Sequence, residues 1–175
     1  PYGEKSADLL ENFDVPAYKI ASTDTNNIPL LKHVALKGKP MILSSAMATM
    51  EEVELAVSTI RSEGLNEIVM LQCTGNYPAR LSDSNLRVIK TYKEKLNCII
   101  GYSDHTIGSD VAVSAVVMGA AVIEKHFTLD KNLSGPDHKA SLDPHQFKEM
   151  VSAIRNIEKA LGSDIKKPSK SELPN

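Results

Sequence analysis

Short apolar segments alternate with longer amphipathic segments along nearly the whole chain, and this alternation restricts the folds it can adopt. Five segments are apolar on both faces, which is typical of strands in a parallel sheet covered by helices: residues 15–22, 39–47, 67–73, 98–103 and 121–128. Helical patterns follow them at 26–38, 49–64, 84–96, 109–120 and 143–162, and one precedes them at 4–14. The sequence therefore predicts an α/β fold with one helix and five βα units.

Two architectures fit this order of elements. An open doubly wound sheet is complete at this size, whereas a (β/α)8 TIM barrel takes about 250 residues. Polar residues follow all five strands, and a barrel brings all its strand ends together at one mouth. We therefore expect residues 1–162 to form a partial TIM barrel, its C-terminal five βα units, with the first three strands upstream. The polar, Pro- and Ser-containing residues 163–175 are expected to be a linker out of the barrel.

Charge and composition restrict the partners. The chain has 20 Lys and Arg against 22 Asp and Glu, which argues against a nucleic-acid partner because such a groove needs a basic surplus. No apolar run approaches the roughly 18 residues of a membrane helix, so we expect no membrane partner. Cys73 and Cys98 form no CxxC motif, and two thiols in apolar runs are typical of a reduced, cytoplasmic protein.

Two consecutive predicted strands each end near a histidine, in "GYSDHT" and "EKHFTLD". Residues i and i+2 share a face of a strand, so Ser103 points with His105 and Glu124 points with His126. Neighbouring strands lie about 4.8 Å apart, so the two imidazoles and the carboxylate are placed to hold a divalent metal. The alternative is that each histidine is a structural residue with satisfied hydrogen bonds.

Lys19 occupies a strand position where an apolar residue is expected, in "AYKIAS". Buried lysines are rare unless they are paired. Three interpretations stay open: a lysine whose amine reaches water at the rim, a Schiff-base lysine, and a cation that meets a phosphate or carboxylate. The hydroxyls of Ser22 and Ser44 follow neighbouring strands and suit a phosphate.

Seven motifs in this order and spacing carry a family resemblance: "YKIASTDTNNIPLL", "KPMILSSAM", "LQCTGNYPA", "NLRVI", "GYSDHT", "EKHFTLD" and "GPDHKASL". Together the chain resembles the sialic acid synthase family, which makes N-acetylneuraminic acid and related bacterial nonulosonic acids. The resemblance implies a TIM barrel followed by an antifreeze-like domain, absent from this chain, and a homodimer at full length. It also implies condensation of phosphoenolpyruvate with an N-acetylated hexosamine, with manganese or magnesium as the divalent metal.

The resemblance also implies roles for individual residues. Phosphoenolpyruvate is assigned to Lys19, Ser22, Ser44 and Ser103. The metal is assigned to His105 and His126, and the catalytic carboxylate to Glu124. The amino sugar is assigned to Asp24, Tyr77 and Asp137, although many members have glutamate where this chain has Asp24.

Two other functions stay open at this point: a metal-dependent TIM-barrel hydrolase, and a non-catalytic remnant that binds a sugar or phosphate. The sequence does not indicate which amino sugar is used, whether N-acetylmannosamine or a diacetamido-hexose. The resemblance further implies that a chain without the first three strands and the antifreeze-like domain is inactive alone.

Overall fold

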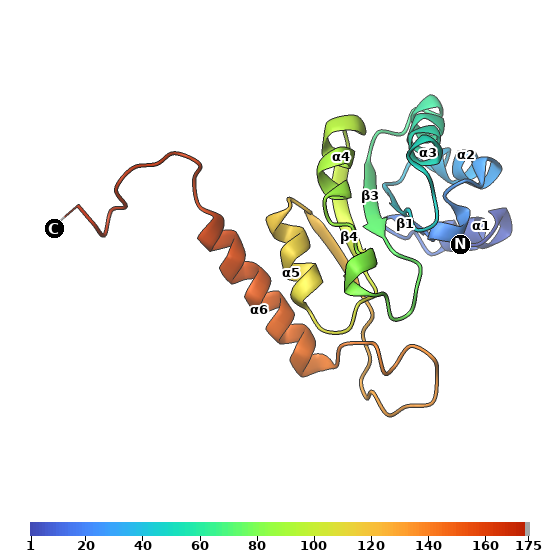
Figure 1. The fold of residues 1–175 in the computed structure, drawn as a ribbon. Helices are drawn as coiled ribbons and strands as arrows, with labels where there is room; N and C mark the ends of the chain where they lie inside the picture. The colour runs from blue at the N-terminus through green and yellow to red at the C-terminus, as the bar shows by residue number, and fades with distance from the viewer. Residues whose placement is uncertain (174–175) are drawn as a thin grey trace.

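Five parallel strands form one curled sheet (Figure 1). The computed structural model describes residues 1–173. Each strand pairs with the next one along the chain, without a reversal of strand order: β1 Tyr18–Ile20, β2 Met41–Ser44, β3 Ile68–Cys73, β4 Ile99–Asp104 and β5 Val122–Lys125. A doubly wound sheet would reverse its order at a switch point, so the prediction of a partial TIM barrel is confirmed.

Residues 1–173 contain six α-helices and two short 3-10 helices, of which α1 precedes the first strand and α6 follows the last. The α-helices are α1 Glu4–Asn12, α2 Ile28–Ala35, α3 Met50–Ser62, α4 Val88–Lys95, α5 Asp110–Val117 and α6 Pro144–Leu161. The 3-10 helices are Ser22–Asp24 and Leu81–Asp83. Capping boxes start α3, with Thr49 and Glu52, and α6, with Asp143 and Gln146. Caps of this kind stabilise a helix end by about 1 kcal/mol.

Several elements are shorter than the sequence predicts. The helix expected from residue 84 begins only at Val88, because Asn85 has a φ of 46°, which no residue of an α-helix has. The first strand is three residues long instead of eight. Strands β4 and β5 end at Asp104 and Lys125, so each histidine of the predicted pair lies one residue beyond its strand.

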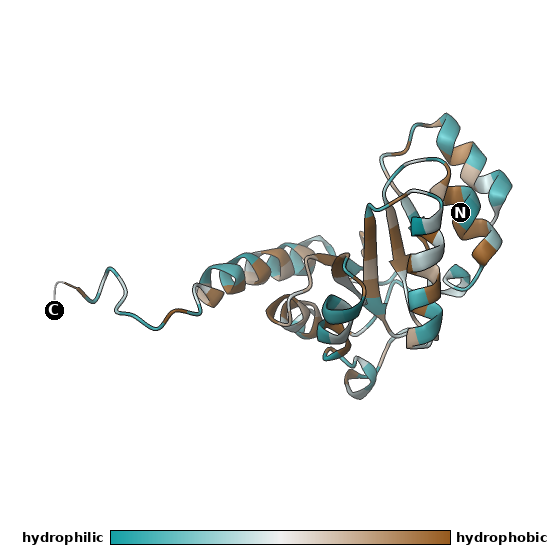
Figure 2. Cartoon of the chain, turned by 90° about the horizontal axis from the view of Figure 1, so that it is seen from above, coloured by the Kyte–Doolittle hydropathy of each residue, from teal (hydrophilic) through white to brown (hydrophobic). Residues whose placement is uncertain are grey.

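The two faces of the sheet differ in character. Alternate strand residues on the outer face are buried against the helices, and Figure 2 shows the strands as the most hydrophobic segments between them. These outward residues are Tyr18, Ile20, Met41, Leu43, Ile68, Met70, Ile100 and Tyr102. The inner face is apolar near the start of the strands, as at Ile42 and Val69, and becomes polar toward their carboxyl ends, at Ser103 and Glu124. We call these carboxyl ends the site edge.

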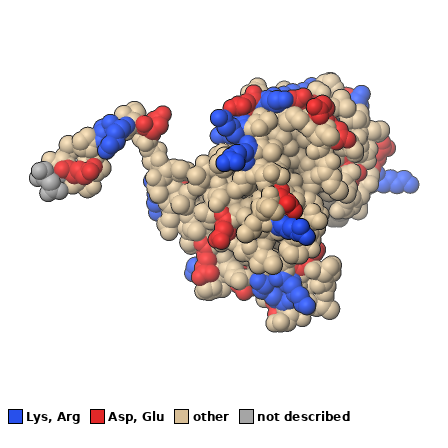
Figure 3. All heavy atoms as spheres, viewed as in Figure 1, with Lys and Arg blue, Asp and Glu red and all other residues tan. Residues whose placement is uncertain are grey.

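The chain leaves the barrel after α6. Residues 163–173 are exposed and contain no helix or strand, and they run away from the sheet (Figure 1). The predicted linker covers 163–175, and its last two residues lie outside the described residues. On the face in Figure 3, side chains of both charge signs are interspersed and most of the surface is uncharged. Within residues 1–173, every helix is too short or too polar to cross a bilayer.

Candidate active site

Lys19 projects from β1 onto the inner face, as its strand position predicts. Its amine Nζ donates a 2.7 Å hydrogen bond to Ser44 Oγ on β2 and lies 3.5 Å from Glu124 Oε2 on β5. It also donates to the carbonyl of Ile20 at 3.2 Å. The Lys19 side chain is 35% exposed, so its ammonium group faces both protein acceptors and the open side of the site. Such a cation is placed to bind an anion.

A second group of residues lies on the last two strands. Ser103 and Glu124 are partners in the register of β4 and β5, and Ser103 Oγ donates a 2.6 Å hydrogen bond to Glu124 Oε1. The same hydroxyl lies 3.4 Å from His105 Nε2. The predicted sharing of a face by Ser103 and His105 is therefore confirmed. Because Glu124 also faces Lys19, its carboxylate joins the lysine side of the site to the histidine side.

The backbone of the loop after β3 fixes the ring of His105. The imidazole Nδ1 lies 2.7 Å from the carbonyl oxygen of Thr74. A carbonyl only accepts, so Nδ1 carries the proton and Nε2 keeps a free lone pair on the side of Ser103. Burial lowers the pKa of the His105 imidazole, and the hydrogen bond to Thr74 offsets part of that effect. A neutral ring with a free Nε2 is the form that binds a metal.

His126 and Tyr77 complete the histidine side. The ring centroids of His105 and His126 are 5.4 Å apart with the planes nearly perpendicular. The ring of Tyr77 stacks on His105 at 4.0 Å and meets His126 edge-on at 5.1 Å. Asp137 approaches His126 from the loop between β5 and α6, with Oδ2 3.9 Å from Nδ1. The structure therefore brings these four predicted residues together.

The donor set fits a divalent metal ion held by two imidazoles. Metal–nitrogen bonds of about 2.1 Å let two rings at the observed centroid distance share one ion. Among residues 1–173, no group of three or more His, Cys, Asp and Glu side chains is arranged to hold a metal. Cys73 lies 3.8 Å from His105 but on its Nδ1 side, so its thiol is not aimed at the position that Nε2 faces. Two protein ligands leave most coordination positions open.

Two predicted residues, Asp24 and Ser22, bond to groups outside the set of predicted site residues. Asp24 is nearly buried, and its carboxylate accepts hydrogen bonds from Asn27 at 3.0 Å and Thr23 at 3.3 Å. Ser22 Oγ accepts a 3.0 Å hydrogen bond from the amide of Ala46 in the loop after β2. Both residues shape the site edge, while their assignment to substrates stays a prediction.

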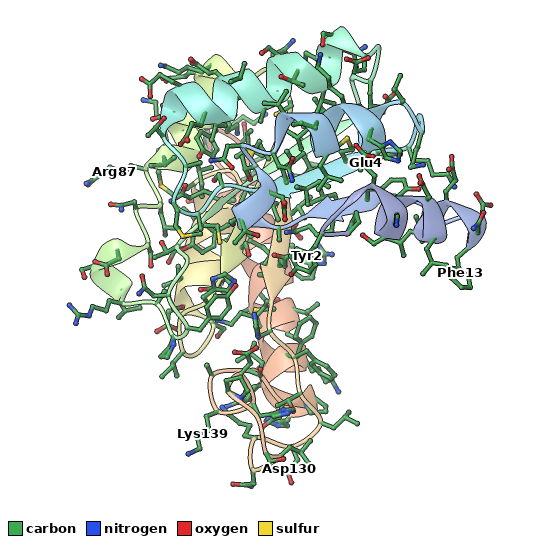
Figure 4. The ribbon with its side chains drawn as sticks, turned by 90° about the vertical axis from the view of Figure 1, so that its right-hand side faces the viewer. Tyr2, Glu4, Phe13, Arg87, Asp130 and Lys139 are labelled. Atoms are coloured by element: carbon green, nitrogen blue, oxygen red, sulfur yellow. The ribbon has the colours of Figure 1, made fainter. Side chains whose placement is uncertain are left out.

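The long loop between β5 and α6 extends beyond the site edge. Figure 4 shows its residues Asp130 and Lys139 at the end of the molecule opposite to α3. His138, in the same loop, bonds through Nδ1 to Thr128 Oγ1 at 2.8 Å. This loop places Asp137 near His126, and the bond from His138 to Thr128 ties the loop to the residues directly after β5.

Sequence reasoning missed two contributors to the site. Thr74 acts through its backbone carbonyl, which carries no side-chain signal. The outward charges of Asp104 and Lys125, directly before the two histidines, appear in the sequence as polar residues at strand ends. Their positions in the strands could have revealed this, because side chains alternate between the two faces of a strand and both of these point toward the helices.

The NeuB family model matches residues 1–166. The chain belongs to the NeuB family. An uncharacterized protein of Methanocaldococcus jannaschii, MJ1065, is 50% identical over 172 residues, which cover 98% of this chain and 51% of that protein. The N,N'-diacetyllegionaminic acid synthase of Campylobacter jejuni is 45% identical over 177 residues, covering 100% of this chain and 53% of the synthase.

A solved structure that superposes on nearly the whole chain confirms the fold of this NeuB-family member. The N-acetylneuraminic acid synthetase of Leptospira borgpetersenii, crystallised with citrate, superposes with a TM-score of 0.93 at 37% identity. The match covers 99% of this chain and 61% of that one. This chain spans about half the length of the curated relatives named here.

Proposed function

We propose that this chain forms the substrate-binding part of an enzyme that condenses phosphoenolpyruvate with an N-acetylated hexosamine. The products are a nonulosonic acid and phosphate. The observation that carries the proposal is the contact of Lys19 with both Ser44 and Glu124, which sets a cation for an anionic substrate beside the catalytic carboxylate. Membership of the NeuB family and the names of its synthases support the choice of reaction.

Phosphoenolpyruvate is a compact anion, and the residues on the lysine side suit it. Lys19 supplies the charge, while Ser44 and Ser103 supply hydroxyl donors. Ser44 accepts a hydrogen bond from Lys19, and Ser103 donates one to Glu124. These contacts keep the donors in place before an anion arrives, so little reorganisation is needed on binding.

The histidine side suits the sugar in its open-chain aldehyde form. His105 and His126 would hold the divalent metal, for which we propose manganese or magnesium; when bound it supplies Lewis-acid polarisation of the aldehyde oxygen. Tyr77 stacks on His105 and offers a flat apolar surface with a hydroxyl to the sugar. Asp137 faces His126 from the loop beyond β5 and is placed to accept hydrogen bonds from sugar hydroxyls.

Glu124 lies between the two substrates and is assigned the proton transfers. The C2=C3 π electrons of phosphoenolpyruvate form a bond from C3 to the aldehyde carbon, while the aldehyde C=O π bond opens and its oxygen takes a proton. The cationic carbon left at C2 then adds water. Phosphate then leaves with cleavage of its bond to C2. The Glu124 carboxylate can take the proton of that water or stabilise the positive charge at C2. Its hydrogen bond from Ser103 fixes which oxygen is available.

The two alternatives are less well supported by the geometry. A metal-dependent hydrolase would use a further histidine or carboxylate, but the spare histidine, His138, is bonded to Thr128. A non-catalytic remnant would not need to keep the Lys19–Glu124 contact and the pair of adjacent histidines in one site. We also propose that the full-length enzyme is a cytoplasmic homodimer, as the family resemblance implies.

The test is phosphate release from phosphoenolpyruvate by the full-length protein. A panel of N-acetylated hexosamines, including N-acetylmannosamine and 2,4-diacetamido-hexoses, is offered with and without Mn²⁺. We expect one sugar to support rapid, metal-dependent release and the others to give little. Phosphate release without any sugar, or none with every sugar of the panel, would argue against the proposed condensation.

A further inference from the structure

A buried ion pair lies on the outer face of the sheet, where the preceding outward residues of β4 are apolar. Asp104 and Lys125 are register partners on β4 and β5, and Asp104 Oδ2 lies 2.8 Å from Lys125 Nζ. Their side chains are 0% and 1% exposed. Ile100 and Tyr102, the preceding outward residues on β4, are buried hydrophobic residues. Two charges have therefore been taken completely out of water on the strands that carry the histidines.

Besides bonding to each other, Asp104 and Lys125 both form hydrogen bonds with Thr106. Asp104 Oδ1 accepts from the amide of Thr106 at 2.9 Å and from its hydroxyl at 2.8 Å. Lys125 Nζ donates to the carbonyl of Thr106 at 2.5 Å. The amide, hydroxyl and carbonyl of Thr106 are thus all held. His105 lies between Asp104 and Thr106, so the chain is fixed on both sides of it.

We infer that Asp104 and Lys125 are positioning residues that set the orientation of His105 relative to His126. Each charged residue directly precedes one of the histidines, and strand alternation turns the histidines to the opposite, inner face. Because the pair joins β4 to β5, it fixes the two backbones from which the imidazoles project. The inference depends on the proposed function at one point, the assumption that His105 and His126 bind the metal.

The energetics of buried charges favour a geometric role over a purely stabilising one. A buried ion pair commonly adds no net stability compared with two apolar side chains of similar volume. Apolar residues occupy the preceding outward positions of β4 and would fill these positions as well. An apolar pair could not form hydrogen bonds with the amide, hydroxyl and carbonyl of Thr106. Without those bonds the backbone at His105 would be free to rotate.

A competing explanation is that Thr74 alone orients the ring. Its carbonyl accepts from His105 Nδ1 at 2.7 Å, and it belongs to a different loop. If that bond were sufficient, removing the ion pair would leave His105 in its single Nδ1–H tautomer. The tautomer therefore distinguishes the two explanations without any metal or turnover.

The experiment uses the full-length protein and the double variant Asp104→Asn/Lys125→Met, which leaves no uncompensated buried charge. Long-range ¹H–¹⁵N spectra of the metal-free protein report the tautomer, with His105 assigned through His105→Gln. Titration with Mn²⁺ alone reports metal affinity. We expect a mixture of tautomers at His105 and a loss of affinity of about tenfold, as is typical when groups that orient ligands are removed.

The matched control is Asp8→Asn/Lys37→Met. Lys37 has a side chain that is 8% exposed and an amine 2.6 Å from Asp8, and it ties α1 to the end of α2, away from the histidines. This control is expected to keep both the tautomer and the affinity. Equal losses in both double variants would overturn the inference, because they would reflect a general loss of structure.

Three further outcomes decide the matter. A folded Asp104→Asn/Lys125→Met variant with an unchanged tautomer and unchanged affinity overturns the inference. A changed tautomer in a protein that binds no Mn²⁺ even when unsubstituted supports the positioning role and contradicts the metal site instead. If the double variant does not fold, Thr106→Val removes only the hydroxyl bond; a smaller shift in the same direction supports the inference and no shift overturns it.

Discussion

Lys19 and Glu124 lie on the first and last strands of the five-stranded sheet, yet their side chains approach to 3.5 Å. Strands spaced about 4.8 Å apart would place the edges of a flat five-stranded sheet nearly 20 Å from one another. The contact is possible only because the sheet curls and both side chains point to its inner face. The curvature thus brings the amine of Lys19 to the carboxylate of Glu124.

We expect Lys19→Ala, in the full-length enzyme, to raise the Michaelis constant for phosphoenolpyruvate by about 10- to 100-fold. Hydrogen bonds to charged groups contribute about 1.5–3 kcal/mol, and the constant for the sugar is expected to change far less. Lys19→Arg is expected to be a partial rescue at best, because a planar fork replaces a point charge. Steady-state kinetics with each substrate varied in turn measure these effects.

Lys32→Ala is the control for Lys19. Lys32 lies on α2, and its amine pairs with Glu63 at 3.6 Å in an exposed position. Its removal is expected to leave both Michaelis constants unchanged. A normal constant for phosphoenolpyruvate in Lys19→Ala would contradict the assignment, and a borohydride-trapped adduct on Lys19 would point to a Schiff base.

The two histidines are expected to act as a unit. His105→Ala and His126→Ala should each weaken Mn²⁺ binding by at least about tenfold, and the double variant should lose little more than the worse single one. His145→Ala, on the exposed face of α6, serves as the control and should bind normally. Metal titration followed by electron paramagnetic resonance gives the four affinities. Additive losses would mean that the rings do not share an ion.

Gly101 is expected to tolerate no side chain. A Cβ at this position would collide with the side chain of Leu71 and with the backbone carbonyl of Val122, on the two neighbouring strands. Overpacking of a core costs about 1–3 kcal/mol, and we expect Gly101→Ala to reach at least about 2 kcal/mol. Urea unfolding measures the loss. Gly3→Ala meets nothing within 4 Å, so a similar loss there would contradict the steric explanation.

Tyr102→Phe is expected to leave stability at pH 7 unchanged or raise it by about 1 kcal/mol. Among residues 1–173, no group forms a hydrogen bond with the buried Tyr102 hydroxyl, and an unsatisfied buried group costs about 1–3 kcal/mol. Tyr92→Phe is the matched control, because the Tyr92 hydroxyl donates a 2.9 Å hydrogen bond to Ser45. It should lose about 1 kcal/mol. A loss of that size in Tyr102→Phe would contradict the prediction.

The same residue predicts a loss of stability in alkali. Burial raises the pKa of Tyr102 from 10 to about 12, so the unfolded chain ionises first as the pH rises. The contribution of the neutral Tyr102 side chain to the free energy of unfolding is complete below pH 10 and is lost progressively between pH 10 and about 12. Its full size is up to about 3 kcal/mol. The alkaline slope of the unfolding free energy should be smaller in Tyr102→Phe, and an unchanged slope would exclude this tyrosine as its source.

The sequence predicted the parts of the fold that depend on local pattern and parallel register. Apolar runs and alternation place Ser103 beside Glu124, and polar residues at all five strand ends distinguish a barrel from an open sheet. The late start of α4 was not predictable, because the left-handed backbone of Asn85 has no strong pattern of its own. The assignment of Asp24 to the amino sugar, which the family resemblance implies, stays a prediction; in the structure its carboxylate accepts hydrogen bonds from Asn27 and Thr23.

The remaining features depend on tertiary contacts. The carbonyl of Thr74 belongs to a loop whose path is set by the whole sheet, and it orients His105 without any side-chain signature. Asp104 and Lys125 look like solvated charges at strand ends, and only their burial on the helix-covered face shows that they pair. Residues recognisable only by their tertiary contacts therefore escaped sequence reasoning, whereas the inward-facing side chains at the strand ends did not.

The curled sheet separates the site into two walls, with Lys19 and Ser44 on β1 and β2, and the histidines after β4 and β5. The Lys19–Glu124 contact joins them across the open face. Mutations in the loops after β3 and β5, which carry Tyr77 and Asp137, alter one wall without rebuilding the other. Under the proposed function, one wall would bind the three-carbon donor and the other the acceptor sugar, which makes these two loops the place to redirect acceptor choice by directed evolution.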